Sequence, residues 1–201
     1  MMMAGTVRPE FRFRQAEQGF SILEVLFSIV VLTIGLVSML AMFSVAIAST
    51  NSAQEDMIAK QEAATTLESL FTARNTSQIT WAQIQNVSNG GIFLDNAQLV
   101  LDPGPDGLVG TADDTNANPS CPGPSRCLVL PGPDGVLGTA DDVLQPLNNY
   151  QRTITITNVG APGGGIDATL RSVTISVTYT TTQFKATQKT YSVGAYISQF
   201  R

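Results

Sequence analysis

Hydrophobic residues are concentrated near the start of the chain, between Gly19 and Ala48. From Val25 onward this stretch has no charged residue and no proline. Its apolar run is interrupted only by small or hydroxyl-bearing residues, namely Ser28, Thr33, Gly35, Ser38 and Ser44. A helix rises about 1.5 Å per residue, so the run is long enough to cross a hydrocarbon core roughly 30 Å thick. The pattern predicts a membrane-spanning helix over residues 20–48.

The pattern changes over residues 49–75 but remains helical. Apolar residues recur there at spacings of three, four and seven, which indicates one helical face. They are Ala53, Met57, Ala64, Leu67 and Phe71. Polar and charged residues fill much of the remaining surface, namely Glu55, Asp56, Lys60, Gln61, Glu62 and Glu68. We predict an amphipathic continuation of the same helix, ending near Asn75, with its apolar stripe packed on a sheet. The alternative is that the stripe binds a partner.

Strand-like alternation dominates the C-terminal part of the chain. Apolar residues there alternate with threonine and serine in three runs, namely Ile154 and Ile156, then Val173, Ile175, Val177 and Tyr179, then Tyr191, Val193, Ala195 and Ile197. This predicts an antiparallel meander over residues 150–201, connected at Gly160–Gly165 and Gln183–Thr187, with one apolar and one threonine-rich face. Residues 77–101 are mixed, with a short helix, a turn, and either a strand or a loop edge. The predicted fold class is α+β, with a globular head over residues 76–201 packed on the long helix.

An internal repeat lies within residues 102–142. Pro103–Asp114 reads PGPDGLVGTADD and Pro131–Asp142 reads PGPDGVLGTADD, so the copies differ only by exchange of Leu-Val for Val-Leu. We call them repeat 1 and repeat 2. Eight of the ten prolines lie between Pro103 and Pro146. That density excludes an ordinary helix or sheet interior and predicts a shaped loop.

The negative charge of the chain is concentrated in this loop, which holds seven aspartates and one arginine. Each repeat offers an aspartate on a glycine turn, a threonine hydroxyl and an Asp-Asp pair. These residues are Asp106, Thr111, Asp113 and Asp114 in repeat 1, and Asp134, Thr139, Asp141 and Asp142 in repeat 2. Oxygen ligands on tight turns suit Ca²⁺, so calcium is a candidate cofactor. The alternative is a pair of Asp-Gly turns with solvated carboxylates, since the spacing is not that of an EF-hand.

Cys121 and Cys127 are the two cysteines of the chain, and they lie between the repeats in the segment CPGPSRC. On the outer side of a membrane they would meet an oxidising environment, so we predict a disulfide that closes a small loop. A redox or metal-binding role would call for a C-x-x-C spacing or for histidines. The chain has no histidine.

Glu24 stands out at the start of the apolar helix, because a carboxylate in lipid costs up to a few kcal/mol unless it is paired or near the interface. It could simply reach back toward the headgroups. Its neighbours favour another reading. A short basic leader, Gly19, Phe20 and a glutamate four residues later together resemble the class III signal of type IV prepilins and pseudopilins. The resemblance covers residues 19 to about 45.

In that family a prepilin peptidase cuts after the glycine on the cytoplasmic side and N-methylates the new terminus. The family glutamate then neutralises the terminal amine of an adjacent subunit in the filament. The resemblance implies that residues 1–19 are a leader peptide, that Gly19 and Phe20 form the processing site, and that Glu24 is the assembly residue. It also implies three partners: other pilin subunits through the N-terminal helix, the prepilin peptidase, and an inner-membrane assembly platform.

The leader carries Arg8, Arg12 and Arg14, which the positive-inside rule keeps in the cytoplasm. The expected location is therefore a single pass in a bacterial inner membrane with the C-terminus outside, followed by transfer to a pilus at the cell surface. A secretory signal cleaved after Ala48 is the alternative. Against it, the apolar segment of a secretory signal normally spans about 7–15 residues, and this run is longer.

The family resemblance leaves several functions open. No proline occurs over Met39–Phe43, where many major pilins carry one, and the stretch IGLVSML resembles minor pilins and pseudopilins. We expect a minor pilin that primes or modifies assembly. The alternatives are a pseudopilin of type II secretion, a major pilin, or a calcium-dependent adhesin on a pilin stem.

Enzymatic functions have little support in the sequence. Without histidine the chain cannot use Ser-His-Asp or Cys-His catalysis or His-ligated zinc. The stretch GAPGGG lacks the lysine and the following helix of a phosphate-binding loop. An isoelectric point near 4.6 argues against nucleic-acid binding. Local contacts by Lys185, Lys189 and Arg201 stay open. We expect a structural protein rather than an enzyme.

Overall fold

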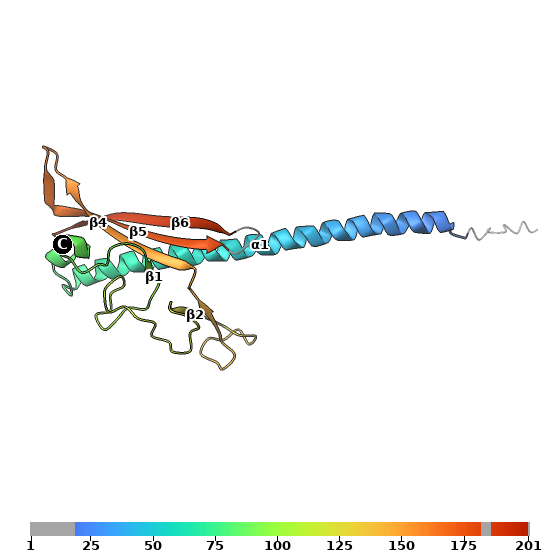
Figure 1. The fold of residues 1–201 in the computed structure, drawn as a ribbon, viewed down its shortest axis with the longest axis horizontal. Coiled ribbons are helices and arrows are strands. Elements are labelled where there is room, and N and C mark those ends of the chain that lie inside the picture. The colour runs from blue at the N-terminus through green and yellow to red at the C-terminus, as the bar shows by residue number, and fades with distance from the viewer. Residues whose placement is uncertain (1–18, 182–185, 201) are drawn as a thin grey trace, which may run out of the picture. The chain divides into compact units, whose positions relative to one another are not determined.

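The computed structural model describes residues 19–181 and 186–200, so most of the predicted leader lies outside the described residues. The chain divides into two compact units, the first ending at Ala46 and the second beginning at Ile47. A single helix, α1 (Ile22–Asn75), runs through both units (Figure 1). Its bounds confirm the prediction of one long helix that continues beyond the apolar stretch and ends at Asn75.

The second unit contains a four-stranded antiparallel sheet in the order β1-β4-β5-β6. The bounds are Gln98–Leu99 for β1, Tyr150–Gly160 for β4, Ile166–Thr181 for β5 and Thr187–Ser198 for β6. Ile154 lies opposite Ile175, and Val177 lies opposite Tyr191. The predicted meander is confirmed, with its first connection at the predicted glycine-rich turn. Part of the predicted second connection falls on residues 182–185, outside the described residues.

The apolar face of the sheet packs on the second half of α1 and forms the core of the head. Three alanines of the helix, Ala59, Ala63 and Ala73, are buried there. Because alanine has a small side chain, the sheet can approach the helix closely at these positions. On the sheet side the core residues include Val173, Ile175 and the other members of the predicted alternation, which bury apolar area. The fold is therefore α+β.

Most of the residues predicted to form the buried apolar stripe of the helix are exposed instead. Met57 is 68% exposed, and Ala53 and Ala64 are exposed as well, whereas Leu67 and Phe71 are half-buried. The buried face of the helix in this unit consists of Ala48, Ile58, Ala59, Glu62, Ala63, Thr66, Leu70 and Ala73. It includes two polar residues with partners elsewhere in the head, since Glu62 pairs with Arg126 and Thr66 accepts from Arg152. The spacing of apolar residues alone could not predict that these two are buried.

The segment between helix and sheet contains two short 3₁₀ helices, η1 (Trp81–Gln83) and η2 (Val87–Asn89). Beyond β1, the loop predicted over residues 102–142 is mostly irregular. It also contains a strand that was not predicted, β2 (Cys127–Leu130), which pairs antiparallel with β3 (Val143–Pro146). Repeat 2 forms the connection between these two strands, so the twin-repeat region includes a small β-hairpin.

Candidate functional site

The predicted processing site lies directly before α1. Gly19 and Phe20 are exposed and precede the first helical residue, Ile22. Ser21 caps the helix, because its Oγ accepts a hydrogen bond from the backbone N–H of Leu23 at 3.3 Å. The cap separates an accessible Gly-Phe bond from a regular helix.

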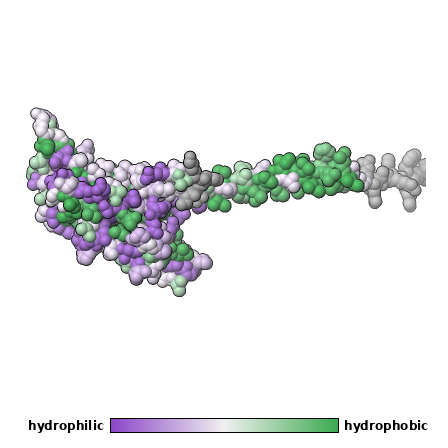
Figure 2. All heavy atoms as spheres, in the orientation of Figure 1, coloured by the Kyte–Doolittle hydropathy of each residue, from purple (hydrophilic) through white to green (hydrophobic). Residues whose placement is uncertain are grey.

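The first half of α1 is apolar on all sides and exposed in this chain, as Figure 2 shows for one face. Three hydroxyl groups within it donate to carbonyl oxygens of the preceding turn: Ser28 to Glu24, Thr33 to Val30 and Ser38 to Ile34, each at 2.8 Å. These side chains therefore satisfy their hydrogen bonds inside the helix, as a lipid-facing helix requires. The helix is long and apolar enough to span a membrane.

Glu24 lies in the first turn of α1, where a negative charge is favoured by the partial positive charge of the helix N-terminus. Within the described part of the chain it belongs to none of the salt bridges. Its exposed carboxylate is the one acidic group on an otherwise apolar surface over residues 20–48. A cation from outside the described chain could therefore reach it.

The two repeats adopt the same local fold. In each, the first aspartate accepts a hydrogen bond from the backbone N–H two residues on, at 2.8 Å in both copies. The threonine hydroxyl donates to the first carboxylate of the Asp-Asp pair, Thr111 to Asp113 and Thr139 to Asp141. The second aspartate of the pair accepts from a glycine N–H, at 2.6 Å in repeat 1 and 2.7 Å in repeat 2. A shared sequence has thus produced a shared turn geometry.

Repeat 1 is docked into the head. Leu108 is 2% exposed and belongs to the core cluster. The carbonyl oxygen of Gly110 accepts a hydrogen bond from the Leu94 N–H at 2.8 Å. Asp114 forms a buried salt bridge to Arg152 of β4, with Oδ2 and Nη2 3.2 Å apart. Repeat 1 is therefore held by an apolar anchor, a backbone hydrogen bond and an ion pair.

Repeat 2 has the same turn without these contacts. Val136 and Leu137, which occupy the positions of Leu108 and Val109, are 55% and 60% exposed. Asp142, the counterpart of Asp114, is in none of the salt bridges of the described residues. Repeat 2 therefore presents to solvent the apolar pair that repeat 1 buries as Leu108 and Val109.

A buried charge network connects the twin-repeat region to the helix. Arg126, inside the cysteine loop, lies 2.8 Å from Oε1 of Glu62 on α1 and 3.8 Å from Oδ1 of Asp102. Burial raises the pKa of Glu62, and Arg126 and Arg152 oppose that rise by favouring the carboxylate. Burial likewise raises the pKa of Asp114 and lowers that of Arg152. The network therefore depends on its cations to keep the carboxylates ionised.

The predicted disulfide between Cys121 and Cys127 is present. It closes the loop that carries Arg126. The backbone on either side is fixed as well, since Arg126 N donates to Val100 O and Leu147 N donates to Arg126 O. The disulfide loop therefore positions the arginine that faces Glu62.

The sequence analysis missed this network and placed Glu62 on the surface, whereas it is buried. A signal for part of it existed. Arg152 is in phase with Ile154 and Ile156 of β4, so it points to the buried face. The partners Glu62 and Arg126 had no such signal, because they are brought together from a helix and a loop.

The predicted calcium ligands fall into two separate groups, one in each repeat. Among the described residues, no three or more His, Cys, Asp or Glu side chains gather closely enough to hold a metal ion. The carboxylates of Asp113 and Asp141 instead accept hydrogen bonds from the backbone N–H groups of Asp106 and Asp134. Calcium binding stays a prediction, and an ion would need oxygens that these hydrogen bonds now use.

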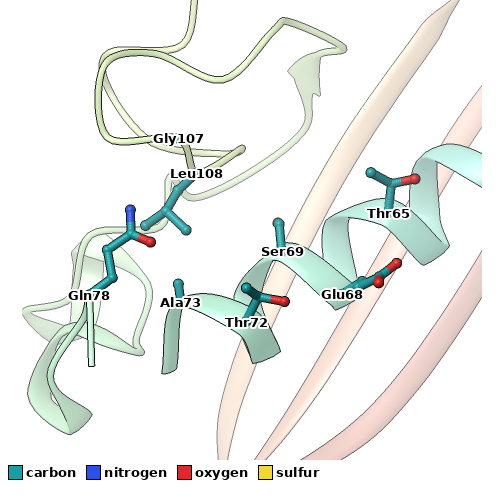
Figure 3. A pocket seen from close by; sticks show the side chains of 8 residues that line it. All are labelled: Thr65, Glu68, Ser69, Thr72, Ala73, Gln78, Gly107 and Leu108. Atoms are coloured by element: carbon teal, nitrogen blue, oxygen red, sulfur yellow. The ribbon is translucent and has the colours of Figure 1, made fainter. Parts of the chain in front are cut away.

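A surface hollow of about 290 Å³ lies between α1 and repeat 1 (Figure 3). Hydroxyl groups of Thr65, Ser69 and Thr72 and the carboxylate of Glu68 line it on the helix side, and Leu108 borders it on the other. None of the predicted site residues lines it. The hollow marks where the docked repeat meets the helix.

Comparisons of the chain with protein-family models, with curated proteins and with solved structures return no match.

Proposed function

We propose that this chain is a structural subunit of a type IV pilus or a related filament, of the minor-pilin kind that primes or modifies assembly. Prepilin peptidase would cut after Gly19 and N-methylate Phe20. The partners would be other pilin subunits, the peptidase and the inner-membrane assembly platform.

The observation that carries this proposal is the division of one continuous helix into two surfaces. From Phe20 to Ile47 the large hydrophobic side chains are exposed, whereas from Ile58 to Ala73 one face is buried by the sheet. An apolar surface of that extent needs a lipid or protein cover. A segment that first spans a membrane and then packs with like helices in a filament core would be covered at both stages.

Glu24 fits the same account. In a filament core an unpaired carboxylate or an unpaired ammonium is costly, whereas the pair is tolerated. Cleavage after Gly19 would create the α-amine of Phe20 close to the membrane interface. The amine of one subunit and Glu24 of its neighbour would then neutralise each other, which favours insertion in a defined axial register.

The first experiment is mass spectrometry of the mature protein isolated from membranes and from filaments. We expect an N-terminus at N-methylated Phe20. A mature terminus at Ser49 would instead identify a cleaved secretory signal and overturn the proposal, because the apolar helix would then be absent from the mature chain.

The second experiment replaces Glu24 with alanine. The variant should be cleaved and inserted normally, since neither step needs the carboxylate, but its amount in purified filaments should fall at least tenfold. Glu68→Ala, which removes an exposed carboxylate further along the same helix, is the matched control and should leave incorporation unchanged. Normal incorporation of Glu24→Ala would show that this charge pairing is dispensable here.

An adhesin on a pilin stem is a second candidate, favoured by the exposed apolar pair of repeat 2. Deletion of the subunit separates the two functions. Loss of filaments supports a role in assembly, whereas normal filaments that no longer adhere support the adhesin.

A further inference from the structure

Repeat 2 has nearly the same sequence and turn as repeat 1, but it is not packed against the rest of the described chain. Repeat 1 shows how such a turn can dock. Repeat 1 inserts Leu108 into the core and places Asp114 against Arg152. Repeat 2 has the same turn hydrogen bonds, and its Val136 and Leu137 therefore project from the same framework. These two side chains are more than half exposed. The surface that would cover them is not supplied by the described residues of this chain.

A second uncovered surface lies on the outward side of α1 in the head. Ala53, Met57, Lys60 and Ala64 are all exposed and follow one another at helical spacing. We call these four residues the outward helix face. Met57 is a flexible side chain that adapts to different apolar partners. This is the stripe that the sequence predicted to be buried, and the sheet of the same chain leaves it uncovered.

Charge makes the two surfaces complementary. Repeat 2 carries Asp134 and Asp141, both exposed, and no salt bridge of the described residues involves either of them. Lys60 is exposed. Its Nζ lies 5.9 Å from the centre of the Tyr191 ring, and its charge also acts on Asp56 one turn earlier on α1. The outward helix face therefore combines apolar groups with a cation, and repeat 2 combines apolar groups with carboxylates.

We infer that repeat 2 of one copy docks on the outward helix face of a second copy. Val136 and Leu137 would pack against Met57 and its neighbouring alanines, and the aspartates would face Lys60. The contact between two copies would combine apolar packing with a charge pair, as the contact of repeat 1 with the core does. This inference rests on the proposed function in one respect: it names the head contact between neighbouring subunits.

The symmetry of such a contact also fits a filament. Two different patches of the same chain meet, so each copy keeps one patch free for the next. A contact of this heterologous kind forms either a closed ring or an open helical array, and it does not stop at a symmetric dimer. It would add a link between the globular parts of neighbouring copies to the association of their apolar helices.

The test places a photo-reactive benzoylphenylalanine at position 136 of the full-length chain in the cells that produce it. Irradiation should yield a covalent dimer of this chain, and mass spectrometry should locate the cross-link on the peptide containing Met57. The same group at position 157, an exposed threonine of β4, is the matched control and should give at least tenfold less dimer. No dimer above this control, or cross-links only to other peptides or other proteins, would overturn the inference.

A charge variant adds a second measurement. Lys60→Glu should reduce the cross-link yield from position 136 at least fivefold, whereas Lys60→Arg should keep it. Both changes are at an exposed position, and an unchanged melting temperature would show that the head is folded. Equal yields in the two variants would contradict the charge pairing.

The mature N-terminus separates this inference from the proposed function. Processing at Phe20 without the cross-link would leave the pilin proposal standing and remove the head contact. The cross-link without processing at Phe20 would keep the contact and remove the pilin proposal.

Discussion

Repeat 1 and repeat 2 are nearly the same sequence in two environments. Both fold into the same turn, with matching hydrogen bonds from threonine hydroxyls and backbone N–H groups to their aspartates. Repeat 1 is buried against the helix and sheet through Leu108 and Asp114. Repeat 2 connects two strands of a small hairpin and is exposed. Local sequence determined the turn, and the rest of the chain determined whether the turn became part of the core.

The comparison also separates two kinds of stabilisation. Hydrogen bonds inside a turn replace hydrogen bonds to water, so their net contribution is small, about 1 kcal/mol each. Burial of an apolar side chain contributes about 1.5–3 kcal/mol, and repeat 2 lacks this contribution. Repeat 2 should therefore be the looser of the two copies.

The two repeats should differ most in the stability lost when the buried ion pair of repeat 1 is broken. Arg152→Met removes the cation that faces Asp114 and leaves a buried carboxylate unpaired, so the free energy of unfolding should fall by about 3–5 kcal/mol. Asp142→Asn, which changes the counterpart of Asp114 in repeat 2, should change it by less than about 0.5 kcal/mol. The measurement is denaturant unfolding of the detergent-solubilised chain followed by Trp81 fluorescence.

A double variant checks the cause of that loss. Adding Asp114→Asn to Arg152→Met removes the unpaired charge and should restore at least about 1 kcal/mol. A double variant no more stable than Arg152→Met alone would mean that the loss comes from packing and not from the charge.

The next largest difference is expected at the apolar pair. Leu108→Ala should destabilise the head by about 3 kcal/mol, because it leaves a cavity in the core. Leu137→Ala makes the same chemical change in repeat 2, and it should cost less than about 0.5 kcal/mol because the side chain is exposed. The same unfolding measurement applies. Equal losses would mean that repeat 2 is covered in solution.

Removal of calcium should affect the two repeats to different degrees. If each repeat binds one ion, EDTA should speed limited proteolysis within residues 102–142 and leave the sheet over residues 150–200 intact. Repeat 2 should respond more strongly than repeat 1, because it has no docking contacts to hold it when the ion leaves. Equal cleavage with and without EDTA, and a melting temperature that calcium does not raise, would favour simple Asp-Gly turns.

The smallest difference between the two repeats is expected in their response to acid. Hydrogen bonds from Thr111 and Thr139, supported by backbone N–H groups, lower the pKa of Asp113 and Asp141 below the ordinary value of 3.8. A lowered pKa in the folded state means that these carboxylates stabilise the turns above pH 3.8 and that this contribution is lost as the pH falls further.

Repeat 1 should resist that loss better than repeat 2. Repeat 1 keeps its buried Leu108 and the hydrogen bond from the Leu94 N–H to the Gly110 carbonyl when its carboxylates are protonated. As the pH falls below 3.8 we therefore expect amide protection to fall more at Asp134 than at Asp106, the two residues whose N–H groups donate to the titrating carboxylates. Hydrogen exchange measures this directly. Equal protection at both residues would mean that docking adds nothing to the turn.

Much of the fold could be predicted because its signals are local. The charge-free run before Ala48 fixes a helix, and the alternation around Ile154 and Ile175 fixes strands and their buried face. Predicting the disulfide needed only the two closely spaced cysteines and their expected place on the outer side of the membrane. The failure was the amphipathic helix, where Met57 was expected inside and Glu62 outside. Besides Ile58 and Leu70, the buried face consists of alanines, Thr66 and the paired Glu62, which hydropathy does not assign strongly to the interior.

By itself the sequence determined the helix, the strands, the shared turn of the two repeats, and the Gly19, Phe20 and Glu24 pattern on which the pilin proposal rests. Each depends on neighbours within a few residues, so chain periodicity and turn chemistry are sufficient. The tertiary structure alone decided which side of the helix faces the sheet, which repeat enters the core, and that Arg126 meets Glu62. Those outcomes depend on groups distant in the sequence whose desolvation is offset only when they meet.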